Sequence, residues 1–240
     1  MTEKYTCQIN KDQSFEIKLQ DGVFHPTGTS DEIIKAVSVN IVSPGKVLDL
    51  GCGSGVVGFA LHMLGKLDGT LYASDLSQDA TLLIEENARN LDIPVISRQG
   101  SIFEPWENES FDYIVDDISG IAERVAEISP WFSKTSCISG EDGTDLVIEA
   151  INNAPEHLNL GGKFFFPVLS LSKADKIIET ANTVFTKVTK VAHKKWRLPD
   201  EMKVHMDTLV DLRSKGLIHF EEKYGWLLWS TDVYMAESPK

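Results

Sequence analysis

The chain has 240 residues, enough for one large hydrophobic core and short for two. Its shares of hydrophobic (42%) and charged (25%) residues are those of an ordinary globular domain, and its longest apolar run, Phe164–Leu169, is too short to cross a bilayer. The formal net charge of −13 makes nucleic acid an unfavourable partner, because nucleic-acid binding depends on lysine and arginine contacts with phosphates.

The first residues and the cysteines indicate the cellular compartment. Met1–Thr6 is polar and lacks the apolar stretch of a secretion signal. The cysteines at 7, 52 and 137 form no Cys-x-x-Cys pair, which favours reduced thiols over a disulfide framework or a zinc site. We therefore expect a cytoplasmic protein with no membrane segment and no metal, and the sequence does not indicate its oligomeric state.

The first 45 residues predict a β-hairpin followed by a helix. Two alternating segments, 5–9 and 14–19, flank a polar turn. The loop Gly22-Val-Phe-His-Pro-Thr-Gly-Thr-Ser30 comes next. Thr29 and Glu32 have the spacing of a capping box, which predicts a helix from about Asp31 to Val39.

From Lys46 onward, short apolar runs alternate with longer amphipathic ones. This alternation is typical of parallel strand–helix–strand units and predicts an α/β fold, a doubly wound and mostly parallel sheet with helices on both faces. The expected strands are 47–50, 70–74, 95–98, 113–115 and 163–168, and the expected helices are 55–66, 77–91, 120–130, 144–158 and 172–184. We assign 46–196 to a ligand-binding core.

The C-terminal part predicts two more strands, 186–196 and 227–236, which bring the sheet to seven strands within one domain, 1–240. Between them, 199–215 has one apolar face and predicts a helix that ends at Gly216. We expect the insertion 197–226 to act as a lid, with Tyr224 or Trp226 facing the substrate, and 227–240 to form the last strand. The alternative is a helix that only packs against the outside of the sheet.

A glycine-rich turn, Asp49-Leu-Gly-Cys-Gly-Ser-Gly55, follows the first strand of the core. Glycines permit a tight turn and let a ligand approach the backbone. Gly53-Ser-Gly-Val-Val-Gly58 also matches the dinucleotide pattern G-x-G-x-x-G. However, the strand enters the turn two residues earlier, at Gly51, and the Asp49 carboxylate would repel a pyrophosphate while suiting a cationic ligand.

Further carboxylates lie at the ends of later strands. Asp75 lies 24 residues after Gly51 (75 − 51), where an acidic side chain accepts hydrogen bonds from ribose hydroxyls; the alternative is a cap for the helix from Ser77. Asp116 and Asp117 end the fourth core strand, at the edge where α/β sheets bind ligands. As neighbours they point in different directions, so one is expected to cap the next helix while the other faces the ligand.

The nonamer Val47-Leu-Asp-Leu-Gly-Cys-Gly-Ser-Gly55 closely resembles the first motif of the class I, Rossmann-like methyltransferases. Over about residues 20–170 the chain is similar to the release-factor glutamine methyltransferases and related small-domain methyltransferases. The further motifs that carry this resemblance are Gly22-Val-Phe-His-Pro26, Phe111-Asp-Tyr-Ile-Val115, Gly140-Glu-Asp-Gly143 and Leu160-Gly-Gly-Lys163.

The resemblance implies S-adenosyl-L-methionine as the cofactor. The residues expected to bind it are Asp49, Gly51, Cys52, Gly53, Asp75, Leu76, Ser101, Ile102 and Asp116. Leu76 is expected against the adenine ring, and Ser101 stands where the family usually offers an Asp to the adenine amino group. A second ligand type, NAD, requires the Gly53 register of the turn and corresponds to an oxidoreductase.

One departure from the family concerns the acceptor. The fourth strand of these relatives ends in Asn-Pro-Pro-Tyr, which holds a planar amide or an exocyclic amine, whereas this chain has Asp117-Ile-Ser-Gly120. We therefore disfavour glutamine and adenine as substrates. Asp117 is the catalytic candidate, as a base or as the partner of a cationic amine, and His25 ranks below it because a lone loop histidine is more often a surface residue.

These observations predict N- or O-methylation of a small molecule or a protein side chain. Besides the oxidoreductase, a second alternative is a cofactor-binding but catalytically silent partner subunit, because the Asn-Pro-Pro-Tyr segment is missing.

Overall fold

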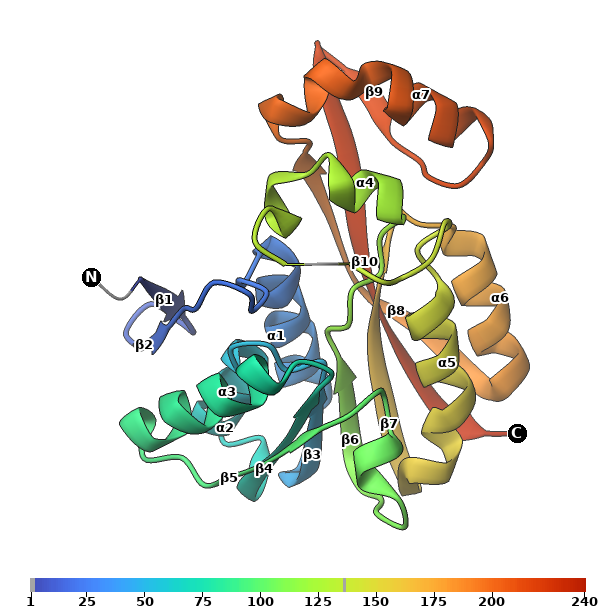
Figure 1. The fold of residues 1–240 in the computed structure, drawn as a ribbon. Helices are drawn as coiled ribbons and strands as arrows, with labels where there is room; N and C mark the ends of the chain where they lie inside the picture. The colour runs from blue at the N-terminus through green and yellow to red at the C-terminus, as the bar shows by residue number, and fades with distance from the viewer. Residues whose placement is uncertain (1–2, 136) are drawn as a thin grey trace.

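A computed structural model describes residues 3–135 and 137–240, so the first two residues of the polar segment Met1–Thr6 lie outside the described part. One central sheet organises the molecule (Figure 1). Its strands lie in the order β5 (Val95–Gln99), β4 (Leu67–Asp75), β3 (Gly45–Leu50), β6 (Phe111–Asp116), β7 (Leu158–Leu169), β10 (Trp226–Pro239) and β8 (Phe185–Arg197). β3 to β7 pair in parallel, and β10 runs antiparallel to both of its neighbours.

These seven strands are the ones that the sequence predicts, and the α/β fold class is confirmed. A further short strand, β9 (Glu221–Lys223), pairs with the start of β10 and was not predicted. β9 consists of three charged residues inside the insertion, so it carries no alternating apolar pattern by which the sequence could reveal it.

Helices cover both faces of the sheet, as its strand–helix alternation predicts (Figure 1). α1 (Gly28–Asn40), α2 (Val56–Met63) and α3 (Gln78–Leu91) pack on one face, and α5 (Asp145–Asn153) and α6 (Ala174–Val184) pack on the other. Within β3, Val47 contributes to the first of these two cores and Leu48 to the second. The apolar runs of the central strands therefore follow from burial on both faces.

The N-terminal hairpin is formed by β1 (Lys4–Gln8) and β2 (Ser14–Lys18), as predicted. Helix α1 begins earlier than predicted, because its capping box is Thr27 with Ser30 and not Thr29 with Glu32. Thr27 has an extended backbone (φ −126°, ψ 178°), as an N-cap requires. This start places Thr29 and Ser30 in the first helical turn, where both line the cavity described below.

The predicted helix 120–130 is shorter, α4 (Glu123–Glu127), and is followed by the 3₁₀ turn η2 (Pro130–Phe132). The predicted helix in the insertion is confirmed as η4 (Asp200–His205) and α7 (Met206–Ser214), followed by Gly216 at φ +67°. Figure 1 shows α7 and β9 above α4, beyond the carboxyl ends of the parallel strands. Apolar residues of α4, η4 and α7, of β10 and of the connecting loops form a separate core: Val125, Leu171, Met202, Leu209, Leu212, Phe220 and Trp229.

No helix in the described ranges has the length and apolar character that a membrane span requires.

Candidate active site

A cavity of about 580 Å³ lies at the carboxyl edge of the sheet, and its size is that of a small-molecule site. The loops after β3, β4 and β5 line one half, which we call the donor half. The start of α1, the loop after β6, the η2 region and the strands β8 and β10 line the other, the acceptor half. The residues proposed from sequence that line the cavity are Gly51, Cys52, Gly53, Asp75, Leu76, Ser101, Ile102 and Asp117.

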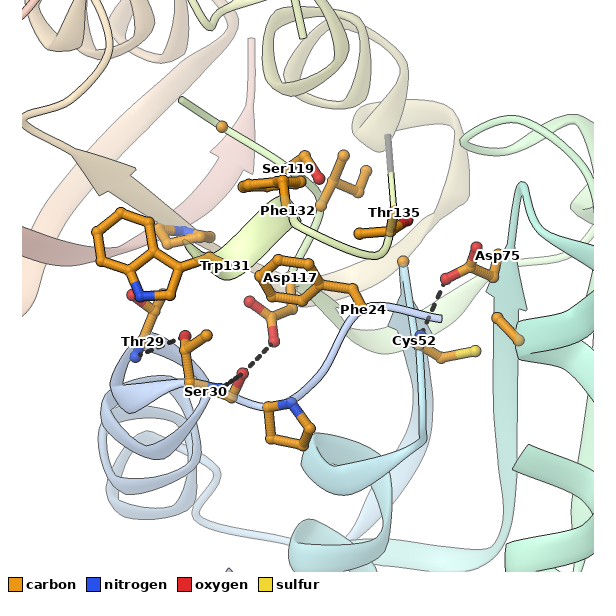
Figure 2. A pocket seen from close by; sticks show the side chains of 18 of the residues that line it. Phe24, Thr29, Ser30, Cys52, Asp75, Asp117, Ser119, Trp131, Phe132 and Thr135 are labelled. Carbon is orange, nitrogen blue, oxygen red and sulfur yellow. Dashed lines mark hydrogen bonds between the residues drawn. The ribbon is translucent and has the colours of Figure 1, made fainter. Parts of the chain in front are cut away.

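Asp75 holds the glycine-rich turn from the next strand. One of its carboxylate oxygens accepts a hydrogen bond from the Gly53 N–H at 2.9 Å (Figure 2), and the other accepts one from the Ser77 N–H at 2.9 Å. Ser77 itself is the N-cap of α3, so Asp75 is not the helix cap. Burial raises the pKa of Asp75, while the N–H donors of Ser77 and Gly53 oppose the rise. An ionised carboxylate has about four acceptor positions, so two are left for ribose hydroxyls.

The turn leaves room for a ligand where a side chain would otherwise project. Gly51 has φ +76°, and a Cβ there would lie 2.9 Å from the Ile118 side chain. Gly53 has φ +49°, but a Cβ there would have only the Phe24 carbonyl oxygen, at 3.5 Å, within 4 Å among the described atoms. Glycine at these two positions keeps the backbone accessible from the cavity, which fits the binding of S-adenosyl-L-methionine along the turn.

The loop after β5 contributes a strained residue to the donor half. Ile102 adopts φ +48°, a conformation that a β-branched residue rarely takes, and it is 7% exposed. Glu104 fixes the loop by accepting a hydrogen bond from the Ser101 N–H at 3.0 Å. Leu76, across the cavity wall, is 52% exposed. The strained Ile102 and the exposed Leu76 both line the donor half, which fits an apolar position for a planar ring.

Asp49 and Asp116 differ from the prediction, because neither lines the cavity. Both are at most 1% exposed; Asp49 accepts a hydrogen bond from the Gly58 N–H at 2.9 Å and Asp116 one from the Ile118 N–H at 2.7 Å. Burial raises the pKa of both carboxyls to about 7. The two side chains fix α2 and the loop after β6 from within the fold, so they support the cavity wall without forming it.

Asp117 lies in the acceptor half and faces the cavity (Figure 2). The Ser30 hydroxyl donates a hydrogen bond to its carboxylate at 2.8 Å, and its own N–H donates to the Leu50 carbonyl at 3.0 Å. Burial raises the pKa of Asp117 well above its ordinary value; Asp49 and Asp116 raise it further, while the Ser30 hydroxyl opposes the rise. Asp117 caps no helix, since the N-cap position of α4 is Ala122.

Aromatic side chains form much of the acceptor half, and sequence reasoning missed them. Trp131 and Trp229 lie 5.2 Å apart between ring centroids, and Trp196 lies 6.3 Å from Trp229. Phe24 and Phe132 pair at 4.9 Å (Figure 2). The aromatic pair Trp131-Phe132 after a proline is the sequence signal that could have indicated part of this wall. Trp196 and Trp229 come together only through the pairing of β8 with β10.

The proposed wall residues of the insertion, Tyr224 and Trp226, do not line the cavity. Tyr224 is 89% exposed, and the Trp226 ring packs under the Arg197 guanidinium, 2.9 Å from its central carbon. The turn between β9 and β10 carries them away from the cavity, and Trp229, further along β10, takes the position expected for Trp226.

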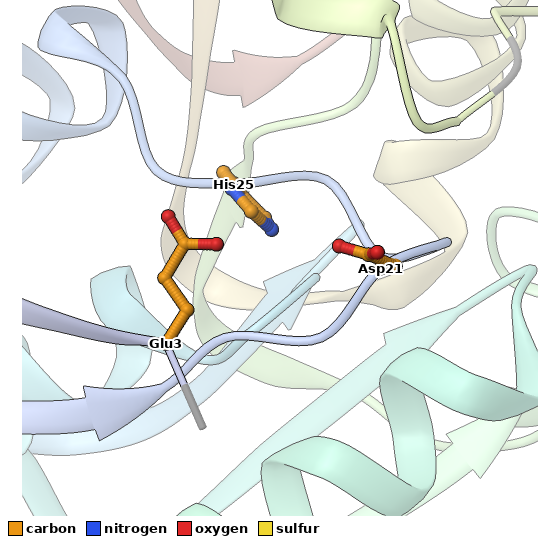
Figure 3. Close-up of side chains that lie close together, drawn as sticks. All are labelled: Glu3, Asp21 and His25. Atoms are coloured by element: carbon orange, nitrogen blue, oxygen red, sulfur yellow. The ribbon is translucent and has the colours of Figure 1, made fainter. Parts of the chain in front are cut away.

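His25 also lies outside this cavity, which does not support a catalytic role. It lines a separate hollow of about 290 Å³ and lies beside Glu3 and Asp21 (Figure 3). The Lys134 ammonium lies 2.7 Å from Asp21 and 3.9 Å from Glu3. Since an ammonium already balances these carboxylates, the group is an ion-paired cluster between the N-terminal loop and the segment after η2.

Sequence comparison identifies the part of the chain that carries the glycine-rich turn. Residues 15–117 match the family model of the methyltransferase small domain. This part of the chain is similar to that family. The matched range spans the cavity loops from Gly22 to Asp117, including Gly53 and Asp75. The resemblance seen in the sequence is thereby confirmed, and S-adenosyl-L-methionine is the cofactor that the domain and the cavity indicate together.

Curated relatives of the domain include the release factor glutamine methyltransferase of Streptococcus pneumoniae, which is 26% identical over 158 residues, covering 63% of this chain and 56% of that protein. Another is the ribosomal protein L11 methyltransferase of Thermotoga petrophila, 30% identical over 116 residues, covering 47% of this chain and 43% of that protein. The chain thus spans about half the length of the curated relatives it matches.

Solved structures extend the similarity to almost the whole chain. The 16S rRNA N2 G1207 methyltransferase of T. thermophilus, in complex with AdoMet and guanosine, gives a TM-score of 0.63 at 15% identity and covers 98% of this chain and 50% of that one. The ribosomal protein L11 methylase of Lactobacillus delbrueckii subsp. bulgaricus gives 0.57 at 17% identity, covering 92% and 84%. The chain therefore has the class I methyltransferase fold.

Proposed function

We propose that this protein transfers a methyl group from S-adenosyl-L-methionine to a nitrogen or oxygen nucleophile of a small molecule or a protein side chain, in the cytoplasm. The observation that carries the proposal is a single cavity that joins the Gly51–Gly53 turn and Asp75 to a facing carboxyl, Asp117. The named substrates of the relatives, release factor and ribosomal protein L11, support an acceptor outside nucleic acid.

Each half of the cavity has a separate task in this reaction. The cofactor, when bound, supplies a methyl group on a positively charged sulfur. Gly51, Gly53 and Asp75 bind and orient it, and the aromatic wall excludes water from the reacting atoms. Asp117 holds the nucleophile in line and accepts its proton at a carboxylate oxygen. The raised pKa of Asp117 makes its carboxylate a stronger base for this task than the carboxylate of an exposed aspartate.

Charge pairing on the edge strand supports an acceptor other than nucleic acid. β8 carries several lysines, but three of them form ion pairs with acidic residues of β9 and β10: Lys187 with Glu237 at 2.6 Å, Lys190 with Asp232 at 2.6 Å, and Lys195 with Glu221 at 2.7 Å. Paired lysines neutralise their neighbours and are less available to phosphates, in agreement with the net charge of −13.

The cofactor assignment is tested at Asp75. We expect Asp75→Ala to weaken S-adenosyl-L-methionine binding by about 1.5–3 kcal/mol, roughly 10- to 150-fold, because hydrogen bonds that the ribose hydroxyls donate to a charged carboxylate are lost. Titration calorimetry measures the affinity, and circular dichroism checks the fold. Asp68→Ala is the matched control, because Asp68 is exposed at the other end of the same strand. Equal affinities of Asp75→Ala and wild type would contradict the assignment.

Binding alone does not separate an enzyme from a silent subunit. A cell extract supplied with methyl-labelled cofactor and the pure protein should yield a labelled small molecule or protein above the extract alone. Cofactor binding without labelling would favour the silent partner subunit.

The insertion is proposed to act as a lid over the acceptor half. We expect replacement of residues 200–222 by a short Gly-Ser linker to preserve cofactor binding and to abolish methyl transfer. The reason is that Met202, Leu209, Leu212 and Phe220 pack with Trp229 and α4, apart from the cores that hold the donor half. Calorimetry and the labelling assay measure the two effects. Loss of folding together with binding would make the segment structural, and full activity would refute the lid.

A further inference from the structure

The acceptor half presents one carboxyl group and little positive charge to a bound ligand. Asp117 lines it and accepts a hydrogen bond from the Ser30 hydroxyl at 2.8 Å, whereas the buried carboxyls of Asp49 and Asp116 do not reach the cavity. Among the described lining residues, Arg197 is the sole lysine or arginine. Its guanidinium packs on Trp226, 2.9 Å from the ring centroid, and lies 3.8 Å from an Asp200 carboxylate oxygen. A cationic group is therefore favoured beside Asp117, and an anionic one is disfavoured.

The walls around Asp117 are flat and aromatic. Three indoles pack against one another as tilted pairs on one side, with Trp229 in contact with both Trp131 and Trp196. Figure 2 shows the Asp117 carboxylate between the rings of Trp131 and Phe24. Aromatic faces attract a cation through their quadrupoles and stack on planar apolar groups. An acceptor that uses both features carries a positive charge and a ring.

The entrance limits the size of the acceptor. Phe24, from the loop before α1, contacts Phe132 of η2 with ring centroids 4.9 Å apart. Nearby, the Asp21–Lys134 ion pair at 2.7 Å joins the same two loops. The loops thus meet over the cavity, whose volume of about 580 Å³ must also hold the cofactor. A small molecule fits this enclosure better than a side chain on a folded protein surface.

We propose that the acceptor is a small primary or secondary amine that carries an aromatic ring, a proposal that rests on the methyltransferase function above. The amine enters as an ammonium, and Asp117 accepts one of its protons. The nitrogen lone pair then forms the N–C bond to the methyl carbon while the C–S bond breaks and its electron pair stays on sulfur. The methylated nitrogen carries the positive charge that sulfur has lost, and Asp117 releases its proton to solvent.

Binding of simple probes tests this substrate class without knowledge of the natural acceptor. The 240-residue protein is saturated with S-adenosylhomocysteine and titrated by calorimetry with phenethylamine, 2-phenylethanol, 3-phenylpropionate and n-butylamine. We expect phenethylamine to bind at least tenfold more tightly than each of the other three. Asp117→Asn should remove the preference for the amine over the alcohol. Trp131→Ala should weaken the binding of phenethylamine and 2-phenylethanol and leave the binding of n-butylamine unchanged.

Several outcomes would overturn the proposal. They are equal or tighter binding of the alcohol, the propionate or n-butylamine; an Asp117→Asn variant that keeps the amine preference; no detectable binding of any probe; and tighter binding of Nα-acetyl-lysinamide, which would indicate a protein lysine. In each case S-adenosylhomocysteine still binds, so the proposed function survives. Failure of S-adenosylhomocysteine itself to bind the wild-type protein would instead contradict the proposed function.

Discussion

Asp117→Asn is expected to lower the rate of methyl transfer by about 10²- to 10⁴-fold, the range that a positioned general base contributes. Asparagine keeps the size of the side chain and an oxygen that can accept the hydrogen bond from the Ser30 hydroxyl, which is 2.8 Å from the carboxylate. It cannot take up a proton from the nucleophile. The labelling assay measures the rate, and calorimetry should show nearly unchanged affinity for S-adenosyl-L-methionine.

A control variant and a second expected result make this experiment specific. The control Asp68→Asn removes an exposed carboxylate at the opposite edge of the sheet and should keep the wild-type rate. Asp117→Asn should not gain activity on glutamine, because Ile118 and Ser119 still stand where the relatives have prolines. A variant as fast as wild type would show that the carboxyl only stabilises the loop through Ser30.

The second large effect is on stability and concerns Asp116. Burial raises its pKa to about 7 in the folded protein, from an ordinary value of 3.8. Between these values the folded state binds more protons than the unfolded state, so the contribution of Asp116 to stability is fully present below about pH 3.8 and is lost as pH rises through about 7. A shift of about three units corresponds to a loss on the order of 4 kcal/mol.

Asp116→Asn should remove this loss. The amide oxygen can still accept a hydrogen bond from the Ile118 N–H, at 2.7 Å in the wild type, and the side chain never ionises. We expect urea unfolding to give similar free energies for both proteins near pH 4 and a more stable variant at pH 8. Asp68→Asn measures the general effect of removing one charge. A difference between variant and wild type that is equal at both pH values would refute the buried, protonated Asp116.

The sequence predicts the cofactor side of this molecule better than the acceptor side. The strands follow from apolar runs, and Asp75 follows from its distance to the glycine-rich turn, because both signals are local. The directions of Asp49 and Asp116 depend on which helix or loop covers each strand face, and the strand pattern alone does not specify this. The aromatic wall depends on pairing between distant segments, as with Trp131 and Trp229.

The start of α1 illustrates the same limit. Thr27 and Thr29 are equally good N-caps by local preference. The structure shows Gly28 under the ring of Trp196, where a Cβ would lie 2.6 Å from the indole. The early start of the helix thus depends on a contact between residues 168 positions apart (196 − 28), which no local sequence pattern reveals.

The division of the cavity has a consequence for how its selectivity can change. Most donor-half residues lie between Leu50 and Ile102, whereas most of the acceptor wall lies in the later segments 117–138 and 196–229. Substitutions in these later segments can therefore alter which molecule is methylated while the affinity for the methyl donor is maintained. Under the proposed function, a library that varies Trp131, Phe132, Trp196 and Trp229 together would change the choice of acceptor and keep cofactor binding, whereas one that varies the loops between Leu50 and Ile102 would also change cofactor binding.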